Sequence, residues 1–302
     1  MTVPAMIGHV RPLTSRDRDD VERLLEADPV AHCFVSSRVL AGGLDPWRLG
    51  GEMLGYVGDD GVSSVLYCGA NLVPVATTPG SRAAFADRLR STGRRCSSFV
   101  GPAAEVLDLW RLLEPAWGPA REVRHAQPVM MIDREPDVAP DPDVRRATPD
   151  DLDVLLPACI DMFTAEVGVS PVAGGMSAAY RARVADIVRE GRSFVRIEGE
   201  TVVFKAEVGA VAGPVCQVQG VWVDPQFRGR GLSKSGMAAV VEQARERIAP
   251  VVSLYVNDYN TAARRAYRSV GFVEAGTVAT VRSEADPVGV GGPDRRGTAQ
   301  LG

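Results

Sequence analysis

The chain has 302 residues, 45% of them apolar and 24% charged, and its formal net charge is −4. This length is typical of two domains with ordinary cores. The weakly acidic balance argues against binding to nucleic acid or to an anionic membrane through bulk charge.

The cysteines and the first residues argue against further classes. The five cysteines are far apart and form no Cys-x-x-Cys pair, so we expect neither a disulfide framework nor a metal site. The first residues lack a positive region followed by an apolar run, and no stretch of about 18 apolar residues exists. From these features we expect a cytoplasmic protein.

Two polar stretches divide the chain. Residues 133–143 are rich in proline and acids, which predicts a linker. Residues 284–302 are polar and rich in glycine, which predicts a disordered tail. The expected organisation is therefore a first domain at 1–132 and a second at 144–283.

The two halves begin alike. The first opens V-R-P-L-T-S-R-D-R-D-D and the second V-R-R-A-T-P-D-D-L-D-V, 134 residues later. Each opening is typical of a short strand, a Thr cap, and a helix with acids in its first turn. A match of this length also arises by chance, but it favours two copies of one fold. The matching residues are Val10, Arg11, Thr14, Asp17 and Asp19, against Val144, Arg145, Thr148, Asp151 and Asp153.

The first half predicts an α/β domain without a phosphate-binding loop. Gly-Asp-Asp-Gly at 58–61 suits a hairpin turn between two strands. No glycine-rich turn of the phosphate-binding kind appears, so we expect this copy to be degenerate. Strands are expected at 52–57, 62–67, 71–75 and 96–100, and helices at 82–91 and 103–113.

The second half has clearer element boundaries. A Gly-Glu pair suits a hairpin turn, and a glycine and a proline close two of the helices. Helices are expected at 150–166, 176–190 and 232–247 and within 257–272, and strands at 193–198, 201–208, 216–223 and 251–256.

The segment V-W-V-D-P-Q-F-R-G-R-G, residues 221–231, joins one of these strands to a helix. Its two glycines leave backbone N–H groups unshielded, and the next helix adds free N–H donors and the positive end of its dipole. Arg228, Arg230 and Lys234 add positive charge. These features favour a pyrophosphate, although the spacing matches neither the P-loop nor the dinucleotide fingerprint. Taken alone, the turn is equally consistent with solvated arginines.

Together with its neighbours, this turn resembles the GNAT superfamily of N-acetyltransferases. The family's acyl-CoA loop follows [Q/R]-x-x-G-x-[G/A], and Gln226 to Gly231 fit every fixed position. Downstream, L-Y-V-N-D-Y-N-T-A-A-R-R-A-Y-R-S-V-G-F at 254–272 is similar to the family's second signature. The resemblance covers residues 143–282. It implies two GNAT-like domains in tandem, each an α/β (α+β) mixed, mostly antiparallel sheet with flanking helices and a splayed central pair of strands.

The resemblance also implies roles for individual residues. Acetyl-CoA would be the co-substrate, with its pantetheine arm lying along the strand edge as one more strand. That edge would be Val221, Trp222 and Val223. The pyrophosphate would lie against Arg228, Gly229, Arg230, Gly231, Leu232 and Ser233. The CoA arm would contact Asn257, Asn260 and Ala262, and Tyr267 would protonate the departing thiolate.

Tyr267 also has a physical argument of its own. It lies two helical turns after Asn260, so the two side chains are expected on one face of the helix. A phenol with a pKa near ~10 stays protonated at neutral pH and can donate to a forming thiolate. The alternative is a core tyrosine packed under Gly271 and Phe272, which the helix pattern alone favours.

The general base is harder to assign. An amine with a pKa near ~10.4 is almost fully charged at neutral pH, so a base or a chain of waters must remove its proton. Many GNAT relatives place a Glu on the central strand where this chain has Gln217, which cannot take a proton. Glu207 is the preferred substitute, because burial in an apolar strand would raise the pKa of its carboxyl group. A Lys-paired or edge-facing carboxylate is the alternative for Glu207, while Glu166 and Asp224 are weaker candidates.

The expected function is an acyl-CoA-dependent N-acyltransferase that moves acetyl to a primary amine by direct attack in a ternary complex. A covalent enzyme is disfavoured because Cys216 stands at a strand start without a His partner. A non-catalytic CoA-binding sensor or scaffold is the alternative, because Gln217 replaces the usual acid. The segment 164–176 would form a wall of the acceptor site. The sequence does not decide which amine is the acceptor or whether the chain forms a homodimer.

Overall fold

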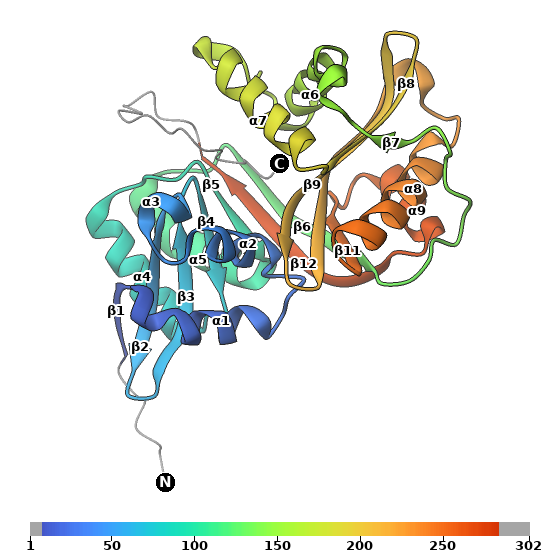
Figure 1. Cartoon of the computed structure of the whole chain (residues 1–302). Coiled ribbons are helices and arrows are strands. Elements are labelled where there is room, and N and C mark those ends of the chain that lie inside the picture. The colour runs from blue at the N-terminus through green and yellow to red at the C-terminus, as the bar shows by residue number, and fades with distance from the viewer. Residues whose placement is uncertain (1–7, 284–302) are drawn as a thin grey trace. The chain divides into compact units, whose positions relative to one another are not determined.

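A computed structural model describes residues 8–283 (Figure 1). They form two compact units, one made of the residues up to 129 together with those from 276 on, and one made of residues 130–275. Each unit carries strands and flanking helices, as the α/β prediction requires. The predicted tail at 284–302 lies outside the described residues.

The first unit builds its sheet in the strand order β1-β2-β3-β4-β5-β12. Only β4 and β5 pair in parallel, and the remaining neighbours are antiparallel. The elements are β1 (His9–Pro12), η1 (Ser15–Asp17), α1 (Arg18–Glu26), α2 (Cys33–Gly42), α3 (Pro46–Leu49), β2 (Glu52–Gly58), β3 (Gly61–Cys68), β4 (Asn71–Val75), α4 (Pro79–Thr92), β5 (Ser98–Pro102), α5 (Ala103–Trp117) and β6 (Glu122–Ile132).

The second unit builds its sheet in the order β11-β10-β9-β8-β7, with β10 and β11 parallel and the rest antiparallel. The elements are β7 (Arg145–Arg146), η2 (Pro149–Asp151), α6 (Leu152–Val167), η3 (Ala173–Gly175), α7 (Ser177–Arg189), β8 (Ser193–Glu198), β9 (Thr201–Ala212), β10 (Val215–Val223), η4 (Pro225–Phe227), α8 (Leu232–Arg247), β11 (Val251–Tyr255), α9 (Thr261–Val270) and β12 (Val273–Arg282).

Both boundaries of the second unit differ from the sequence-based division. The predicted linker at 133–143 has no helix or strand, but it belongs to the second unit, where buried Asp141 accepts a 2.8 Å hydrogen bond from Arg196. At the other end, the residues of β12 from 276 on group with the first unit. The reason is backbone pairing, because residues 278–282 are antiparallel partners of β5.

The repeated opening motif forms the same hydrogen-bonded structure twice. Arg11 donates two hydrogen bonds to Asp17, at 3.0 and 2.6 Å, and Arg145 donates two to Asp151, at 2.7 and 2.8 Å. In both copies the aspartate also caps the backbone N–H of the preceding Thr, and a capping box starts the helix. Because the matching residues form the same hydrogen bonds in both halves, their match supports two copies of one fold better than their identity alone does.

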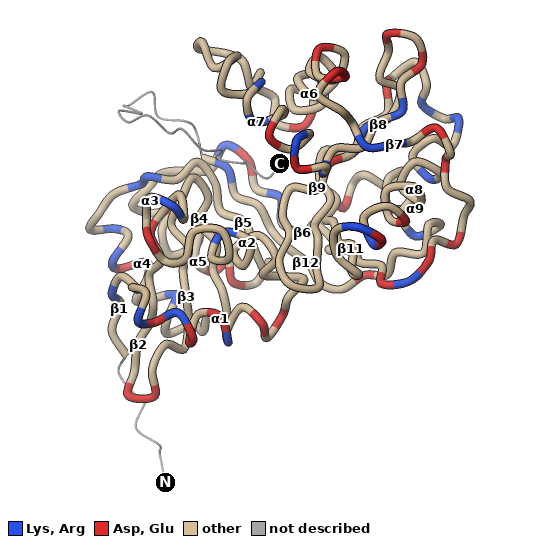
Figure 2. Tube along the Cα trace, viewed as in Figure 1, with Lys and Arg blue, Asp and Glu red and all other residues tan. Residues whose placement is uncertain are grey.

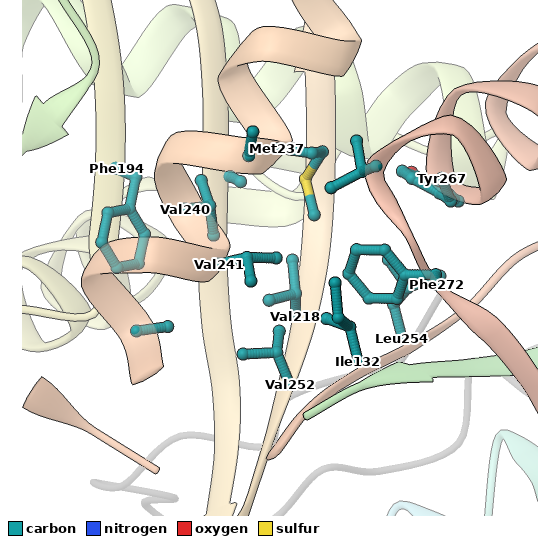
Figure 3. Close-up of a cluster of buried hydrophobic side chains, with 14 of the residues drawn as sticks. Ile132, Phe194, Val218, Met237, Val240, Val241, Val252, Leu254, Tyr267 and Phe272 are labelled. Atoms are coloured by element: carbon teal, nitrogen blue, oxygen red, sulfur yellow. The ribbon is translucent and has the colours of Figure 1, made fainter. Parts of the chain in front are cut away.

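The helices of the second unit cover opposite faces of its sheet. Side chains of α8 and α9 pack in one core on Phe204, Val218 and Leu254, as Figure 3 shows in part. Side chains of α6 and α7 pack in another cluster with Val195. Since side chains alternate along a strand, the neighbours of the α8-facing residues on β9 and β10 face α6 and α7.

Charge is mixed over both units. Lys and Arg alternate with Asp and Glu along the described chain, and ion pairs are spread through it (Figure 2). No helix among residues 8–283 is both long and apolar enough to cross a bilayer. Within the same residues, no group of three or more His, Cys, Asp or Glu side chains is placed to hold a metal ion.

Candidate functional site

The central feature of the second unit is a gap between β10 and β11. The two strands pair only over residues 215–217 and 251–253. On its other side, β10 stays paired with β9 as far as Val223. The remainder of β10 therefore presents a backbone edge with no partner on β11. This divergence is the splayed central pair predicted from the sequence.

The backbone of β10 points the expected residues into this gap. The Asp224 N–H donates to the Val203 carbonyl on β9 at 3.1 Å. Because successive residues of a strand alternate in direction, Val221 and Val223 turn their N–H and C=O groups towards the gap. The Val223 carbonyl accepts a 3.1 Å hydrogen bond from Nε of Arg228. The strand edge and the loop that follows it are thus tied together.

The loop after β10 adopts a conformation that requires its glycines. Gly229 and Gly231 have φ angles of +78° and +84°, in the left-handed region that L side chains rarely adopt. No atom lies within 4 Å of a Cβ built at either position, so the requirement is one of backbone conformation and not of space. Gly231 is the N-cap of α8. The carboxylate of Asp224 caps η4 through the Gln226 N–H at 2.8 Å, which leaves it poorly suited to act as a base.

The loop leaves donors and positive charge open to solvent. Within residues 8–283, no acceptor is recorded for the backbone N–H groups of 229–233, at the start of α8. Arg228, Arg230 and Lys234 are exposed, and none of them is paired with an acid of the described chain. Arg230 stacks 4.9 Å from the centre of the Phe227 ring. This is the chemistry of an anion site at a helix N-terminus.

The predicted site residues after β11 differ in their exposure to solvent. Asn260 is the N-cap of α9, where its side-chain oxygen accepts the Ala263 N–H at 3.1 Å, and its side chain is exposed. Tyr267 is buried, so Asn260 and Tyr267 do not share an environment although they are two turns apart. The cap explains the difference, because it folds the Asn260 side chain back onto the helix start. Asn257 is half-buried and Ala262 is exposed.

Tyr267 belongs to the core and also approaches an acid. Its ring centre lies 5.9 Å from that of Phe272, and both belong to the buried cluster drawn in Figure 3. Burial raises the pKa of the Tyr267 phenol, and the nearby carboxylate of Glu166 raises it further. The phenol is therefore protonated at neutral pH. The charge of Glu166, at the end of α6, therefore acts on the one tyrosine predicted to take part in the reaction.

The pKa argument for Glu207 is wrong. Burial acts to raise the pKa of this carboxyl group, but Lys205, Arg183 and a hydrogen bond from Gln219 together lower it. Lys205 Nζ lies 3.5 Å from Glu207 Oε2, and Gln219 donates to Glu207 Oε1 at 2.9 Å. Glu207 is thus the Lys-paired carboxylate that was the alternative. The cause is a neighbouring cation that reasoning from an apolar strand overlooked.

Two further residues at the gap were missed by sequence reasoning. Lys205 is fully buried on β9, and Gly220 forms a bulge in β10 with φ of +59°. The signals were present, because Lys205 is a lone charge in T-V-V-F-K-A-E-V and Gly220 interrupts a strand. Gln217 is buried, and its Oε1 has no hydrogen-bond partner among the described residues.

The first unit has a corresponding strand, turn and helix, β4 to α4, beside its own parallel pair. There the turn carries no glycine of left-handed φ, and its donors are already used. The Thr77 N–H donates to the Glu105 carboxylate at 2.8 Å, and Thr78 and Ser81 form a capping box. Arg82 binds Asp108 at 2.7 Å. An acidic side chain of the protein thus already accepts a hydrogen bond from a backbone donor at this turn.

Two family models match separate parts of the chain. The acetyltransferase (GNAT) family matches residues 169–272, and a domain of unknown function, DUF4081, matches residues 51–155. The mycothiol acetyltransferase of Thermobispora bispora is 42% identical over 67 residues, which cover 22% of this chain and only 23% of that protein.

Solved structures resemble nearly the whole chain. A GCN5-related N-acetyltransferase from Sphaerobacter thermophilus has a TM-score of 0.59 and 18% identity, covering 93% of this chain and 96% of its own. A tandem GNAT protein from the clavulanic acid biosynthesis pathway has a TM-score of 0.52 and 14% identity, covering 92% and 99%. Likeness at such identity establishes the fold. Residues 169–272 thus match the acetyltransferase (GNAT) family, and the first half fits a divergent first copy of the same fold.

Proposed function

We propose that the protein is an acyl-CoA-dependent N-acyltransferase that transfers acetyl from acetyl-CoA to a primary amine by direct attack in a ternary complex. The observation that carries this proposal is the continuous backbone edge of β10. It begins beside the gap at Val221 and ends in a turn of unshielded N–H groups and exposed cations. A long ligand with an amide-containing arm and a pyrophosphate suits this edge.

In this proposal the parts of acetyl-CoA have separate contacts. The pantetheine amides bind the N–H and C=O groups that Val221 and Val223 turn towards the gap, with Trp222 between them. The pyrophosphate lies on the amides of residues 228–233, with Arg228 and Arg230 beside it. Asn257, Asn260 and Ala262 border the arm from the side of α9. The match with the Thermobispora bispora protein, named an acetyltransferase, supports acetyl as the group transferred.

Tyr267 is proposed as the hydrogen-bond donor to the departing CoA thiolate. A thiol has a pKa near ~8.5, below that of a buried phenol, so the phenol stabilises the thiolate chiefly by donating a hydrogen bond. Its raised pKa keeps the proton available over the whole neutral range. Glu166, whose charge acts on Tyr267, is the carboxylate we propose as base for the amine. Glu207 is not proposed for this role, because cations surround it.

We propose that the acceptor amine enters the site beside the segment that follows α6. That segment follows Glu166 directly and contains η3, in which Gly174 and Gly175 have positive φ angles of 64° and 83°. The buried Oε1 of Gln217 is an acceptor without a partner in the described chain, and it can receive an N–H of the amine. It orients the amine but does not take its proton.

The experiment is a measurement of free CoA released from acetyl-CoA in the presence of a panel of small amines, amino acids and peptides. The expected result is amine-dependent release and an acetylated amine detected by mass spectrometry. Tight binding of acetyl-CoA with only background hydrolysis across the panel would instead support the non-catalytic sensor, which the absence of an acid at Gln217 favours.

A further inference from the structure

Lys205 is an unusual residue in this chain. Only two of the 34 basic residues are lysines, Lys205 and Lys234, and the others are arginines. Lys234 is exposed, whereas Lys205 is completely buried. Its neighbours Phe204 and Ala206 pack into the α8 core, so the Lys205 side chain lies on the face towards α6 and α7. Nearly all other cations of this chain are arginines. A buried lysine here therefore indicates that the position requires a compact ammonium donor, which a planar guanidinium cannot replace.

Among the described residues, the ammonium contacts a backbone carbonyl and a carboxylate, and the Cys159 thiol lies near it. Lys205 Nζ donates to the backbone carbonyl of Gly220 at 3.0 Å and lies 3.5 Å from Glu207 Oε2. Glu207 is in turn held by Gln219, which donates at 2.9 Å, and it lies 3.8 Å from Arg183. The carboxylate therefore neutralises the ammonium, while the ammonium contacts the main chain of β10. A buried ion pair is weak support for stability, which points to a role in local geometry.

The contacted carbonyl belongs to a bulge. Gln219 is the partner of Glu207, and Trp222 is the partner of Lys205, so β10 contains one more residue than β9 between these pairs. Gly220, whose φ is in the left-handed region, lies in this bulge. A Cβ at Gly220 would lie only 3.1 Å from both Lys205 Nζ and Met162 Cε. Glycine is required here both by φ and by the approach of the lysine.

The carbonyl of Gly220 and the N–H of Val221 belong to one planar peptide group and point in opposite directions. A group that fixes the carbonyl on the Lys205 side therefore fixes the N–H on the opposite side. That side is the gap between β10 and β11, because Val221 is turned away from β9. We propose that Lys205 is a positioning residue for the reaction proposed above: its ammonium holds the Gly220 carbonyl and thereby directs the Val221 N–H to the acyl group in the gap.

This inference rests on the proposed function for the identity of the ligand, but the orientation of the peptide is testable without it. Two double variants share a neutral Gln at 207 and differ in whether residue 205 carries an N–H donor. Lys205→Met/Glu207→Gln removes both charges and the donor, so that neither residue of this pair is left as an unpaired buried charge. Lys205→Gln/Glu207→Gln removes both charges but keeps an N–H donor at 205. Circular dichroism and thermal unfolding identify any variant that fails to fold.

The first measurement is steady-state kinetics. The Met-containing double variant is expected to lose about 10- to 100-fold in kcat, with KM for acetyl-CoA within about threefold of the wild-type value, because the misplaced N–H acts on the acyl group. The Gln-containing double variant is expected to recover part of this loss. Arg196→Met, which breaks the ion pair between β8 and the buried Asp141, is the control for a general loss of stability.

The second measurement is the amide resonance of Val221 in ¹⁵N-labelled protein without ligand. It is expected to move in the Met-containing double variant, to move less in the Gln-containing one, and to stay in place in Arg196→Met. Equal kcat values in the two double variants, or an unmoved Val221 resonance, would overturn the role of Lys205. Failure of the wild-type protein to bind acetyl-CoA would instead overturn the proposed function, and the Val221 resonance would still decide whether Lys205 holds the peptide.

Discussion

Tyr267 shows how one side chain serves both packing and chemistry. Its ring packs against Phe272, so the aromatic ring has a structural role whatever its hydroxyl does. Tyr267→Phe keeps the ring and removes the donor. We expect kcat to fall about 10- to 100-fold while the Kd for acetyl-CoA changes less than about threefold. Single-turnover kinetics and calorimetry separate the two effects, and an unchanged kcat would leave Tyr267 with packing alone.

Asp17 illustrates a residue whose charge stabilises the fold. The hydrogen bonds from Arg11, and then those from Thr14, lower the pKa of Asp17 to about 2. Since this pKa is below the unfolded value near ~3.9, the stabilisation is complete above pH ~4 and is lost as pH falls through about 2. Asp17→Asn should lower the free energy of unfolding by about 1–2 kcal/mol at pH 7, after allowance for the partly exposed Arg11.

Denaturant unfolding of Asp17→Asn and wild-type protein from pH 7 to pH 2 checks this expectation. The difference between them should shrink as pH falls below ~4. Asp19→Asn, which changes an exposed acid of the same helix, is the matched control. A difference that is independent of pH would show that the Arg11 pair is not the origin of the effect.

At the scale of single elements, the loop from β10 to α8 depends on its glycines. Gly231→Ala forces a side chain into a left-handed conformation, at a cost of about 1 kcal/mol or more, and disturbs the N–H groups at the start of α8. We expect the Kd for acetyl-CoA to rise about tenfold. Gly213→Ala, in the β9–β10 turn, has a similar φ of +52° and the same open space. It is expected to lose similar stability and to bind normally, and equal weakening by both substitutions would contradict a specific role for the loop.

Elements were predicted well where sequence pattern and local structure coincide. Helix α8 and strand β8 have the predicted bounds, because Gly231 and Pro250 flank the helix and Gly191 and Gly199 flank the strand. Helix α2 and strands β6 and β12 were missed. Strand β6 contains Pro128 and several charges, and β12 contains Gly276, so neither has the alternation of an ordinary strand. Their pairing depends on residues distant in sequence, such as those of β5 for β12.

The candidate site was predictable only in part for the same reason. The loop is a contiguous motif, and its glycines have the positive φ angles that their positions suggested. The environment of Glu207 depends on Lys205, on Gln219 from the neighbouring strand and on Arg183 from α7. Sequence reasoning treated the carboxylate as isolated and therefore assigned the wrong direction to its pKa. The approach of Glu166 to Tyr267 likewise joins elements about a hundred residues apart.

For the whole molecule, the two copies are expected to differ in their capacity to bind acetyl-CoA. The second copy has an open strand edge followed by a loop of unshielded donors. In the first copy, Glu105 and the capping residues already use the donors at the corresponding turn. A bound anion would have to displace this carboxylate, which is held by Thr77 beside the Arg82–Asp108 pair. We therefore expect one acetyl-CoA per chain.

Isothermal titration of acetyl-CoA into the wild-type protein and Arg228→Glu tests the central claim most directly. The account predicts one molecule bound per wild-type chain, and a Kd at least about tenfold higher in Arg228→Glu, because the substitution places an acid beside the pyrophosphate. Arg90→Glu, which makes the same change at an exposed arginine of α4 in the first unit, should bind as the wild type does. Unchanged affinity in Arg228→Glu, or two molecules bound per chain, would contradict the assignment of the loop after β10 as the acetyl-CoA site.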